Sequence, residues 1–189
     1  MSIYTKTGDE GETQRIDGRR VRKSDPFLEV VGSLEELNAH LGLCTVEATR
    51  LAKDDKTASA GFDEIVALLD EVQRRLFGLG AMLGGVDAAT GKAAITPQVL
   101  EHMEAWIDKT AAALPELRRF ILPDGGELSA RLHAARTVAR RAERDTVRFG
   151  DAGGNPPPLA LQYINRLGDW LFLLARLANA KLGLKDREL

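Results

Sequence analysis

The stretch of residues 128–149 restricts the fold of this chain more than any other part of the sequence. Its apolar residues recur at alternating four- and three-residue steps, which places them on one face of a helix: Leu128, Leu132, Ala135, Ala139 and Ala142. Arg136, Arg140 and Arg144 form a second row, each one turn from the next, beside that face. Guanidinium groups repel one another, so the row requires an anion or carboxylates from elsewhere. A solvated basic face is the alternative, and the row alone leaves both open.

Size and composition indicate one globular domain covering residues 1–189. Hydrophobic residues make up 44% of the chain and the formal net charge is -2, so any anion site must be local. The single cysteine, Cys44, cannot form an intrachain disulfide, and its place in an apolar run predicts a buried thiol. The N-terminus has no apolar signal-peptide core and no segment is long enough to cross a membrane, so we expect a cytoplasmic protein without a membrane partner.

Helical patterns recur in five places, and two of them begin with a clear capping signal. Asp25 precedes Pro26, and Thr96 precedes Pro97, which are an N-cap residue and a proline suited to the first helical position. The predicted helices are 25–50, 62–83, 97–114, 128–149 and 159–182, with loops at 53–61, 85–95 and 150–158 and a turn-rich connector at 120–126. We therefore predict an all-α fold without strands. It is an antiparallel five-helix bundle over residues 25–182, with an N-terminal arm at 1–24 and a tail at 183–189.

The N-terminal arm offers chemistry that suits a polyphosphate. Thr5, Lys6, Thr7 and Gly8 combine hydroxyl groups, an ammonium group and accessible backbone amides, and Lys23 ends a basic run further along the arm. Such runs are also common in turns and disordered ends, so the arm is weak as a signal by itself. Together with the arginine row it suggests a site for an anionic small molecule.

Several polar residues interrupt apolar helix faces. Asn165, Asp169 and Arg176 do so in the last helix, where a structural network or a site could satisfy them. Asn38 in the first helix is expected to be a buried residue with a structural hydrogen bond.

We expect His133 to be a partly exposed structural histidine. No histidine follows a glutamate by three residues, so a di-iron site is disfavoured, and one cysteine excludes a cysteine-based zinc site. We predict no protein-bound metal site.

Six motifs occur in an order and at separations that resemble the PduO-type ATP:cob(I)alamin adenosyltransferases. They are Tyr4-Thr5-Lys6-Thr7-Gly8-Asp9 with Gly11, Arg20-Val21 with Lys23 and Asp25, Gly32-Ser33-Leu34-Glu35-Glu36-Leu37-Asn38, Phe120-Ile121-Leu122-Pro123, Ala135-Arg136-Thr137-Val138 continuing through Arg140-Arg141-Ala142-Glu143-Arg144, and Asn165-Arg166-Leu167 with Asp169 and Leu171-Phe172. The resemblance implies a five-helix bundle that forms a homotrimer with active sites at subunit interfaces. It implies transfer of the 5′-deoxyadenosyl group of ATP to cob(I)alamin, with Mg²⁺ on the triphosphate.

The same resemblance implies roles for individual residues. The nucleotide would be bound by Thr5, Lys6, Thr7, Gly8, Thr13, Gln14 and Lys23 of the arm and by Arg140, Arg141, Glu143, Arg144 and Asn165 of the helices. Arg140 and Arg144 would act in catalysis, Phe120 would face the corrinoid and exclude its lower axial ligand, and Glu35 would pair with Arg140 across the interface. The family usually has Asp at the Glu35 position, so the geometry of that pair is open. Gly168 stands where Ser is usual, and we expect this difference to be minor.

Two other functions are compatible with parts of the sequence. A non-catalytic carrier or sensor of adenosylcobalamin or nucleotide would use the same pockets, and turnover would distinguish it. A nucleic-acid-binding bundle is disfavoured by the net charge and by carboxylates such as Glu143 and Asp145 among the arginines. A reductase that produces Co(I) and an enzyme that uses adenosylcobalamin are possible partners.

Overall fold

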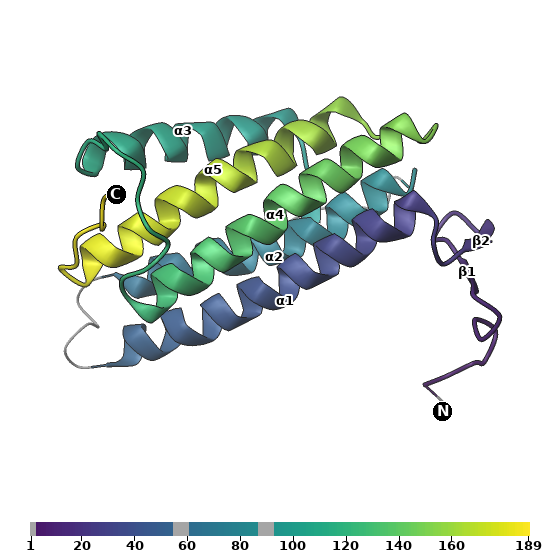
Figure 1. The fold of residues 1–189 in the computed structure, drawn as a ribbon, viewed down its shortest axis with the longest axis horizontal. Coiled ribbons are helices and arrows are strands. Elements are labelled where there is room, and N and C mark those ends of the chain that lie inside the picture. The colour runs from purple at the N-terminus through teal and green to yellow at the C-terminus, as the bar shows by residue number, and fades with distance from the viewer. Residues whose placement is uncertain (1–2, 55–60, 87–92) are drawn as a thin grey trace.

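The computed structural model describes residues 3–54, 61–86 and 93–189, which form five α-helices and two short β-strands (Figure 1). The helices are α1 (Pro26–Lys53), α2 (Phe62–Leu83), α3 (Pro97–Ala113), α4 (Glu127–Asp151) and α5 (Pro158–Lys181). The all-α bundle predicted from the sequence is confirmed, with bounds within a few residues of those expected. Most of two predicted loops, at 55–60 and 87–92, lies outside the described residues.

The predicted capping signals start α1 and α3. The Asp25 carboxylate accepts a hydrogen bond from the Phe27 backbone amide at 2.9 Å, and the Thr96 hydroxyl accepts one from Val99 at 3.4 Å. Pro26 and Pro97 occupy the first helical positions, where the missing N–H has no intrahelical partner to lose. Both helix starts are therefore fixed by local sequence.

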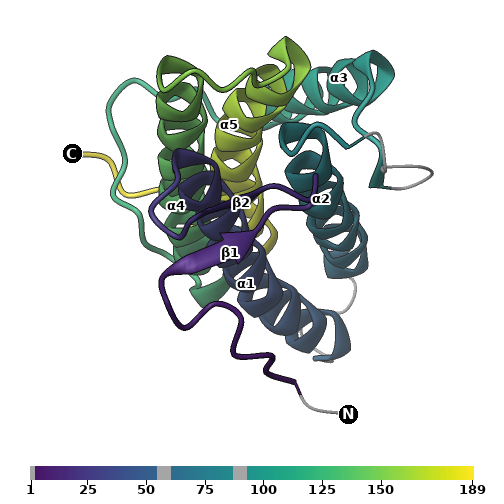
Figure 2. The same ribbon diagram turned by 90° about the vertical axis from the view of Figure 1, so that its right-hand side faces the viewer.

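Four helices surround the core, and α3 packs on the outside against α5 (Figure 2). The pairs α1–α2, α1–α4 and α4–α5 are antiparallel, as predicted (Figure 1). In contrast, α3 and α5 run in the same direction, since Trp106 stacks near Trp170 while Pro115, just beyond α3, meets Arg176 further along α5. Consecutive helices therefore alternate in direction, so the predicted antiparallel bundle is confirmed, and α3 shares its direction with α1 and α5 (Figure 1). The long segments between α2 and α3 and between α3 and α4 allow that parallel placement.

The N-terminal arm contains a two-stranded antiparallel sheet, which corrects the expectation of no strand. Strand β1 (Glu12–Gln14) pairs with β2 (Arg20–Arg22), and Thr13 lies opposite Val21. Gly18 in the connecting turn has φ of 86°, a left-handed conformation that favours glycine. Three-residue strands contain too few positions for a period-2 pattern, so the sequence gives no strand signal here.

The C-terminal tail is fixed against the connector between α3 and α4. Ile121 and Glu188 form an isolated β-bridge, and the Leu189 amide donates to the Phe120 carbonyl at 2.9 Å. Arg176 is buried and donates to Asp186 at 2.7 Å and to the Pro115 carbonyl at 2.6 Å. Arg176 is therefore satisfied by a structural network.

Three further predictions about single residues can be compared with the fold. Cys44 is fully buried, as expected, and burial raises the pKa of its thiol to about 12. Asn38 is half-buried and exchanges hydrogen bonds with Gln73 of α2, as expected for a structural residue. The expectation for His133 is wrong: its side chain is 4% exposed because it lies against Phe172 between α4 and α5, and burial lowers its pKa.

Across the described ranges, no helix is both long and apolar enough to span a bilayer.

Candidate functional site

The N-terminal loop brings five of the predicted nucleotide-binding residues together. The Thr5 and Thr7 hydroxyl oxygens lie 2.8 Å apart, and Lys6 between them has φ of 60°, an uncommon conformation for a residue with a side chain. The Lys23 ammonium group lies close to Gly8, where an added Cβ would be 3.2 Å from Nζ. Two hydroxyl groups and the Lys23 ammonium therefore border one loop of exposed backbone, which is a suitable surface for a polyphosphate.

The hairpin behind this loop supports it. The Lys23 amide donates to the Gly11 carbonyl at 2.8 Å, and the Arg20 guanidinium donates to the Thr7 carbonyl at 3.3 Å. Thr13 is in the centre of β1, and the Gln14 side-chain amide donates across the turn to the Gly18 carbonyl at 3.1 Å. Thr13 and Gln14 therefore lie on the hairpin, while the other five lie around the loop.

A second cluster of predicted site residues lies between α4 and α5. Glu143, with a side chain only 16% exposed, contacts Arg140 at 2.5 Å and accepts a hydrogen bond from Asn165 at 2.8 Å. The Asn165 oxygen in turn accepts from Arg166 at 2.8 Å, and Arg166 pairs with Glu104 of α3. This network fixes Arg140 by an ion pair and Asn165 by a hydrogen bond to a charged acceptor, which is stronger than a neutral hydrogen bond. Asp169, another of the polar residues predicted to interrupt the apolar face of α5, is exposed and faces away from the core.

The contact between α1 and α4 holds Arg141 in place. Arg141 pairs with Glu36 of α1. One turn further along α4, buried Asp145 accepts a hydrogen bond from the Ser33 hydroxyl of α1 at 2.6 Å. Arg144 donates to the Arg140 carbonyl at 3.0 Å, so its charge stays exposed at the surface of α4. Glu143 thus neutralises Arg140 of the row, Glu36 neutralises the adjacent Arg141, and Arg144 remains available to an anion.

Gly168 of α5 lies directly beneath Arg140. A Cβ atom at this position would be 3.1 Å from Arg140 Cδ, closer than ordinary van der Waals contact. The expectation that this glycine is a minor difference stays a prediction, and the structure adds that the absence of a side chain lets the arginine lie against α5. The sequence contains no signal for this contact, because the two residues lie 28 positions apart in different helices.

Glu35 borders a large groove between α1 and α2. The groove has a volume of about 950 Å³, its floor includes Leu34 and Leu76, and the hairpin residue Gln14 closes one end. Within the described parts of the chain no ion pair joins Glu35 to Arg140, whose carboxylate partner is Glu143. Nothing in the sequence indicated that α2 lines this groove. The polar residues of α2 that border it, such as Gln73 and Arg74, have the pattern of an ordinary solvent-exposed helix face.

Phe120 is placed on the connector near the C-terminus. Its side chain is 85% exposed, although its backbone carbonyl is held by Leu189. An exposed phenylalanine on a fixed backbone is available to a hydrophobic ligand or partner. No contact links it to the loop at residues 5–8 within the described ranges.

The predicted site residues therefore form separate groups in one chain. In both views the N-terminal loop extends from the end of the bundle away from the helices (Figures 1 and 2). None of its described residues contacts Arg140 or Arg144. In the described residues no cluster of three or more His, Cys, Asp or Glu side chains could hold a metal ion.

The comparisons with known proteins agree with the helical bundle. The cobalamin adenosyltransferase family profile matches residues 3–178. The corrinoid adenosyltransferase of Bacillus subtilis (strain 168) is 36% identical over 188 residues, covering 100% of this chain and 92% of that protein. The corrinoid adenosyltransferase PduO of Salmonella typhimurium is 38% identical over 178 residues, covering 93% of this chain but only 49% of that protein.

A solved structure has the same fold. It is a variant PduO-type ATP:corrinoid adenosyltransferase from Lactobacillus reuteri complexed with cobalamin and ATP, with a TM-score of 0.84 and 30% identity, covering 100% of this chain and 96% of that one. The fold and site thus define a five-helix adenosyltransferase bundle. The chain belongs to the cobalamin adenosyltransferase family, and its activity is that of an ATP:corrinoid adenosyltransferase.

Proposed function

We propose that the chain transfers the 5′-deoxyadenosyl group of ATP to cob(I)alamin at sites shared between subunits, and releases adenosylcobalamin and triphosphate. The electron pair of cobalt(I) forms the Co–C bond, the C5′–O bond breaks, and its electrons leave with the triphosphate. Cobalt is the nucleophile, so the protein needs no activated side chain and contributes binding, orientation and charge stabilisation. The observation that carries the proposal is that one chain holds both an exposed loop suited to a polyphosphate and a fixed arginine cluster on α4.

The N-terminal loop would bind the triphosphate. Thr5, Thr7 and the backbone at Gly8 supply hydrogen-bond donors, while Lys6 and Lys23 supply positive charge. Bonds from charged donors to phosphate oxygens are roughly twice as strong as neutral ones. The exposed position of the loop supports this role, because it leaves the donors accessible.

Mg²⁺ fits this donor set as an ion carried by the nucleotide. Mg²⁺ usually keeps several waters and binds through substrate phosphates, so the lack of a carboxylate cluster in the described residues is compatible with it. Thr5 and Thr7 could add hydroxyl oxygens from the protein. When bound, the ion would neutralise charge on the triphosphate.

Arg140 and Arg144 would stabilise the charge that develops on the leaving triphosphate. Glu143 and Asn165 hold Arg140 in place before the reaction, so little reorganisation is needed when charge develops. Removing one such preorganised donor costs about 3 kcal/mol of barrier in comparable sites. Arg141, paired with Glu36, would mainly fix α4 against α1.

A homotrimer would bring the separate groups together. A ring of identical subunits uses one type of head-to-tail interface, so the arm of one chain can meet α4 of the next. Large apolar side chains exposed on α1 and α2 support an interface there: Leu43 is 49% exposed, Val46 71% and Phe77 74%. Glu35 on the same face would then pair with Arg140 of the neighbouring subunit.

Phe120 would contact the corrinoid. An apolar ring at the lower face of cobalt excludes a polar axial ligand, which makes reduction from Co(II) to Co(I) easier. Its 85% exposure in the single chain supports a role that is completed by a ligand. A reductase that supplies Co(I) and an adenosylcobalamin-dependent enzyme are the partners that this chemistry requires, and we place the reaction in the cytoplasm.

An anaerobic adenosylation assay tests the proposal. Protein, MgATP and chemically reduced cob(I)alamin should give the spectral change of Co–C bond formation, and omission of ATP should abolish it. Binding of both substrates without this change would instead identify a carrier or sensor.

A further inference from the structure

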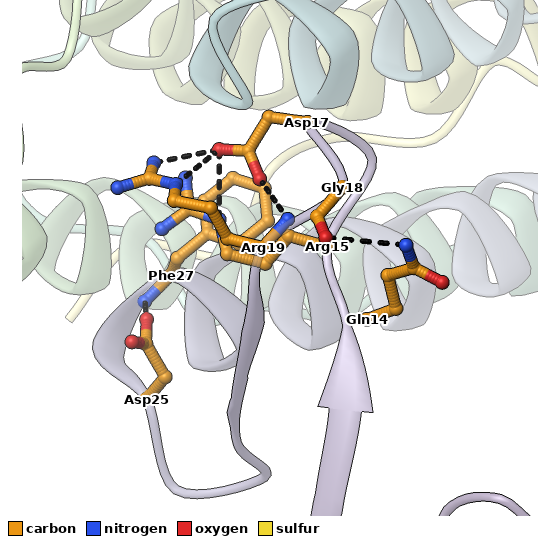
Figure 3. A network of polar contacts seen from close by, with 7 residues as sticks. All are labelled: Gln14, Arg15, Asp17, Gly18, Arg19, Asp25 and Phe27. Carbon is orange, nitrogen blue, oxygen red and sulfur yellow. Dashed lines mark hydrogen bonds and ion pairs between the residues drawn. The ribbon is translucent and has the colours of Figure 1, made fainter.

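The hairpin of the N-terminal arm is attached to the bundle by one buried arginine. Arg15, at the end of β1, is 8% exposed, although arginine is among the residues that are almost never buried without a partner (Figure 3). Its guanidinium carbon lies 3.8 Å from the centroid of the Phe27 ring and 5.9 Å from that of Phe149. Phe27 begins α1 and Phe149 lies near the end of α4, so one side chain contacts two helices of the bundle.

The surroundings of Arg15 suit a cation. A cavity of about 460 Å³ lies between the hairpin and the helix ends, and its walls include Arg15, Leu83 at the end of α2 and Ala152 after α4. The C-terminal ends of helices carry partial negative charge, which favours a guanidinium group. Asp17 adds a carboxylate whose Oδ2 lies 3.4 Å from Arg15 Nε, and the same oxygen lies 2.6 Å from Arg19 Nη2 (Figure 3).

The neighbouring Ile16 adds a steric contact. A Cβ at Gly84 would be 2.5 Å from Ile16 Cγ2, so the hairpin tip lies against backbone that only glycine leaves accessible. Arg15 itself has backbone bonds within the turn, where its amide donates to Arg19 at 2.8 Å and its carbonyl accepts from Gly18 at 3.0 Å. The tip is therefore rigid in itself and contacts the bundle through Arg15 and Ile16.

The hairpin in turn holds the loop at residues 5–8. The Arg20 guanidinium donates to the Thr7 carbonyl, and the Lys23 ammonium group lies against Gly8. A continuous series of contacts thus runs from α1 and α4 through Arg15 and the hairpin to the loop. Figure 2 shows the sheet lying across the start of α1, with the loop beyond it.

We propose that Arg15 is a positioning residue: its stacking on Phe27 and Phe149 fixes the hairpin to the bundle and thereby sets the position of the nucleotide-binding loop. This inference rests on the proposed function, in which that loop binds the triphosphate of ATP. Arg15 touches no reacting atom in this account and acts through Lys23 and Arg20. Its loss therefore weakens ATP binding and leaves the chemical step of bound ATP nearly unchanged.

The test compares full-length Arg15→Met and Arg15→Lys proteins with wild type. Arg22→Met is the matched control, because Arg22 is an exposed arginine in β2 of the same hairpin. Backbone amide hydrogen exchange over residues 12–22 measures the attachment directly. In Arg15→Met this exchange should be about tenfold faster, as expected from loss of a desolvated cation–π contact, while core helices keep their protection. Arg22→Met should exchange as wild type does.

Steady-state kinetics supply the second measurement. Arg15→Met should raise the KM for ATP about tenfold with kcat within about twofold, since it removes binding rather than charge stabilisation in the transition state. Arg15→Lys keeps the charge over the rings and should recover part of the loss. A wild-type KM in Arg15→Met, or unchanged hairpin exchange, would overturn the inference. Failure of the wild-type protein to bind ATP would instead overturn the proposed function.

Discussion

Gly168→Ala should reduce activity without reducing stability, because Gly168 sets the position of Arg140. A Cβ at this position would be 3.1 Å from Arg140 Cδ, and ordinary van der Waals contact begins at 3.4 Å. The arginine must therefore retreat by about 0.3 Å, which disturbs its 2.5 Å contact with Glu143. Misplacement by about 1 Å costs roughly 100-fold in rate. If the barrier rises in proportion to the displacement, a shift of about 0.3 Å lowers kcat/KM about fourfold.

The fold should tolerate this substitution. Alanine in a helix interior is favoured over glycine by about 1 kcal/mol. This gain offsets the cost of moving the Arg140 side chain, so the free energy of unfolding in urea should not fall. Gly150→Ala is the matched control: it lies in α4, and its Cβ would meet only Pro156 at an ordinary 3.5 Å. Gly150→Ala should keep wild-type kinetics. Unchanged kcat/KM in Gly168→Ala, with the control also unchanged, would refute the argument that the bare backbone positions Arg140.

Three further substitutions or probes have defined outcomes. Ser33→Ala removes the hydrogen bond to the buried carboxylate of Asp145. Because hydrogen bonds to charged groups are the stronger ones, the free energy of unfolding in urea should fall by about 2 kcal/mol. A fall of less than about 0.5 kcal/mol would contradict this. Phe120→Ala should impair reduction of bound cob(II)alamin and leave the KM for ATP unchanged, and equal losses in both would count against an apolar wall beside cobalt. Cys44, whose pKa burial raises to about 12, should resist thiol reagents at pH 8 until the protein is denatured, and rapid native labelling would disprove its burial.

The helices could be predicted from the sequence because their signals are local. Asp25 and Thr96 cap α1 and α3 as expected, and the apolar periodicity of 128–149 corresponds to the buried face of α4. The hairpin could not be predicted, since its three-residue strands contain no usable period. The parallel placement of α3 beside α5 depends on tertiary packing between Trp106 and Trp170, which no local pattern encodes.

The sequence predicted a set of site residues, and the structure brings only some of that set together in one chain. The family resemblance implied that Arg140, Glu143 and Asn165 belong to one site, and in the structure Glu143 contacts both of the others. The roles of Gly168 and Arg15 were not predictable, because both depend on contacts between distant segments. Sequence patterns describe Arg15 as one more basic residue in an arm, whereas the fold buries it against two aromatic rings.

The central claim is that the loop of one chain and the arginines of another form each active site, and subunit complementation tests it most directly. Lys6→Ala and Arg144→Ala proteins should each be nearly inactive alone. Unfolding and reassembling them together in equal amounts should restore activity to about a quarter of wild type, because each interface draws its loop and its arginines from different chains. If the mixture stays as inactive as its components although mixed oligomers form, both groups act within one chain and the account is contradicted.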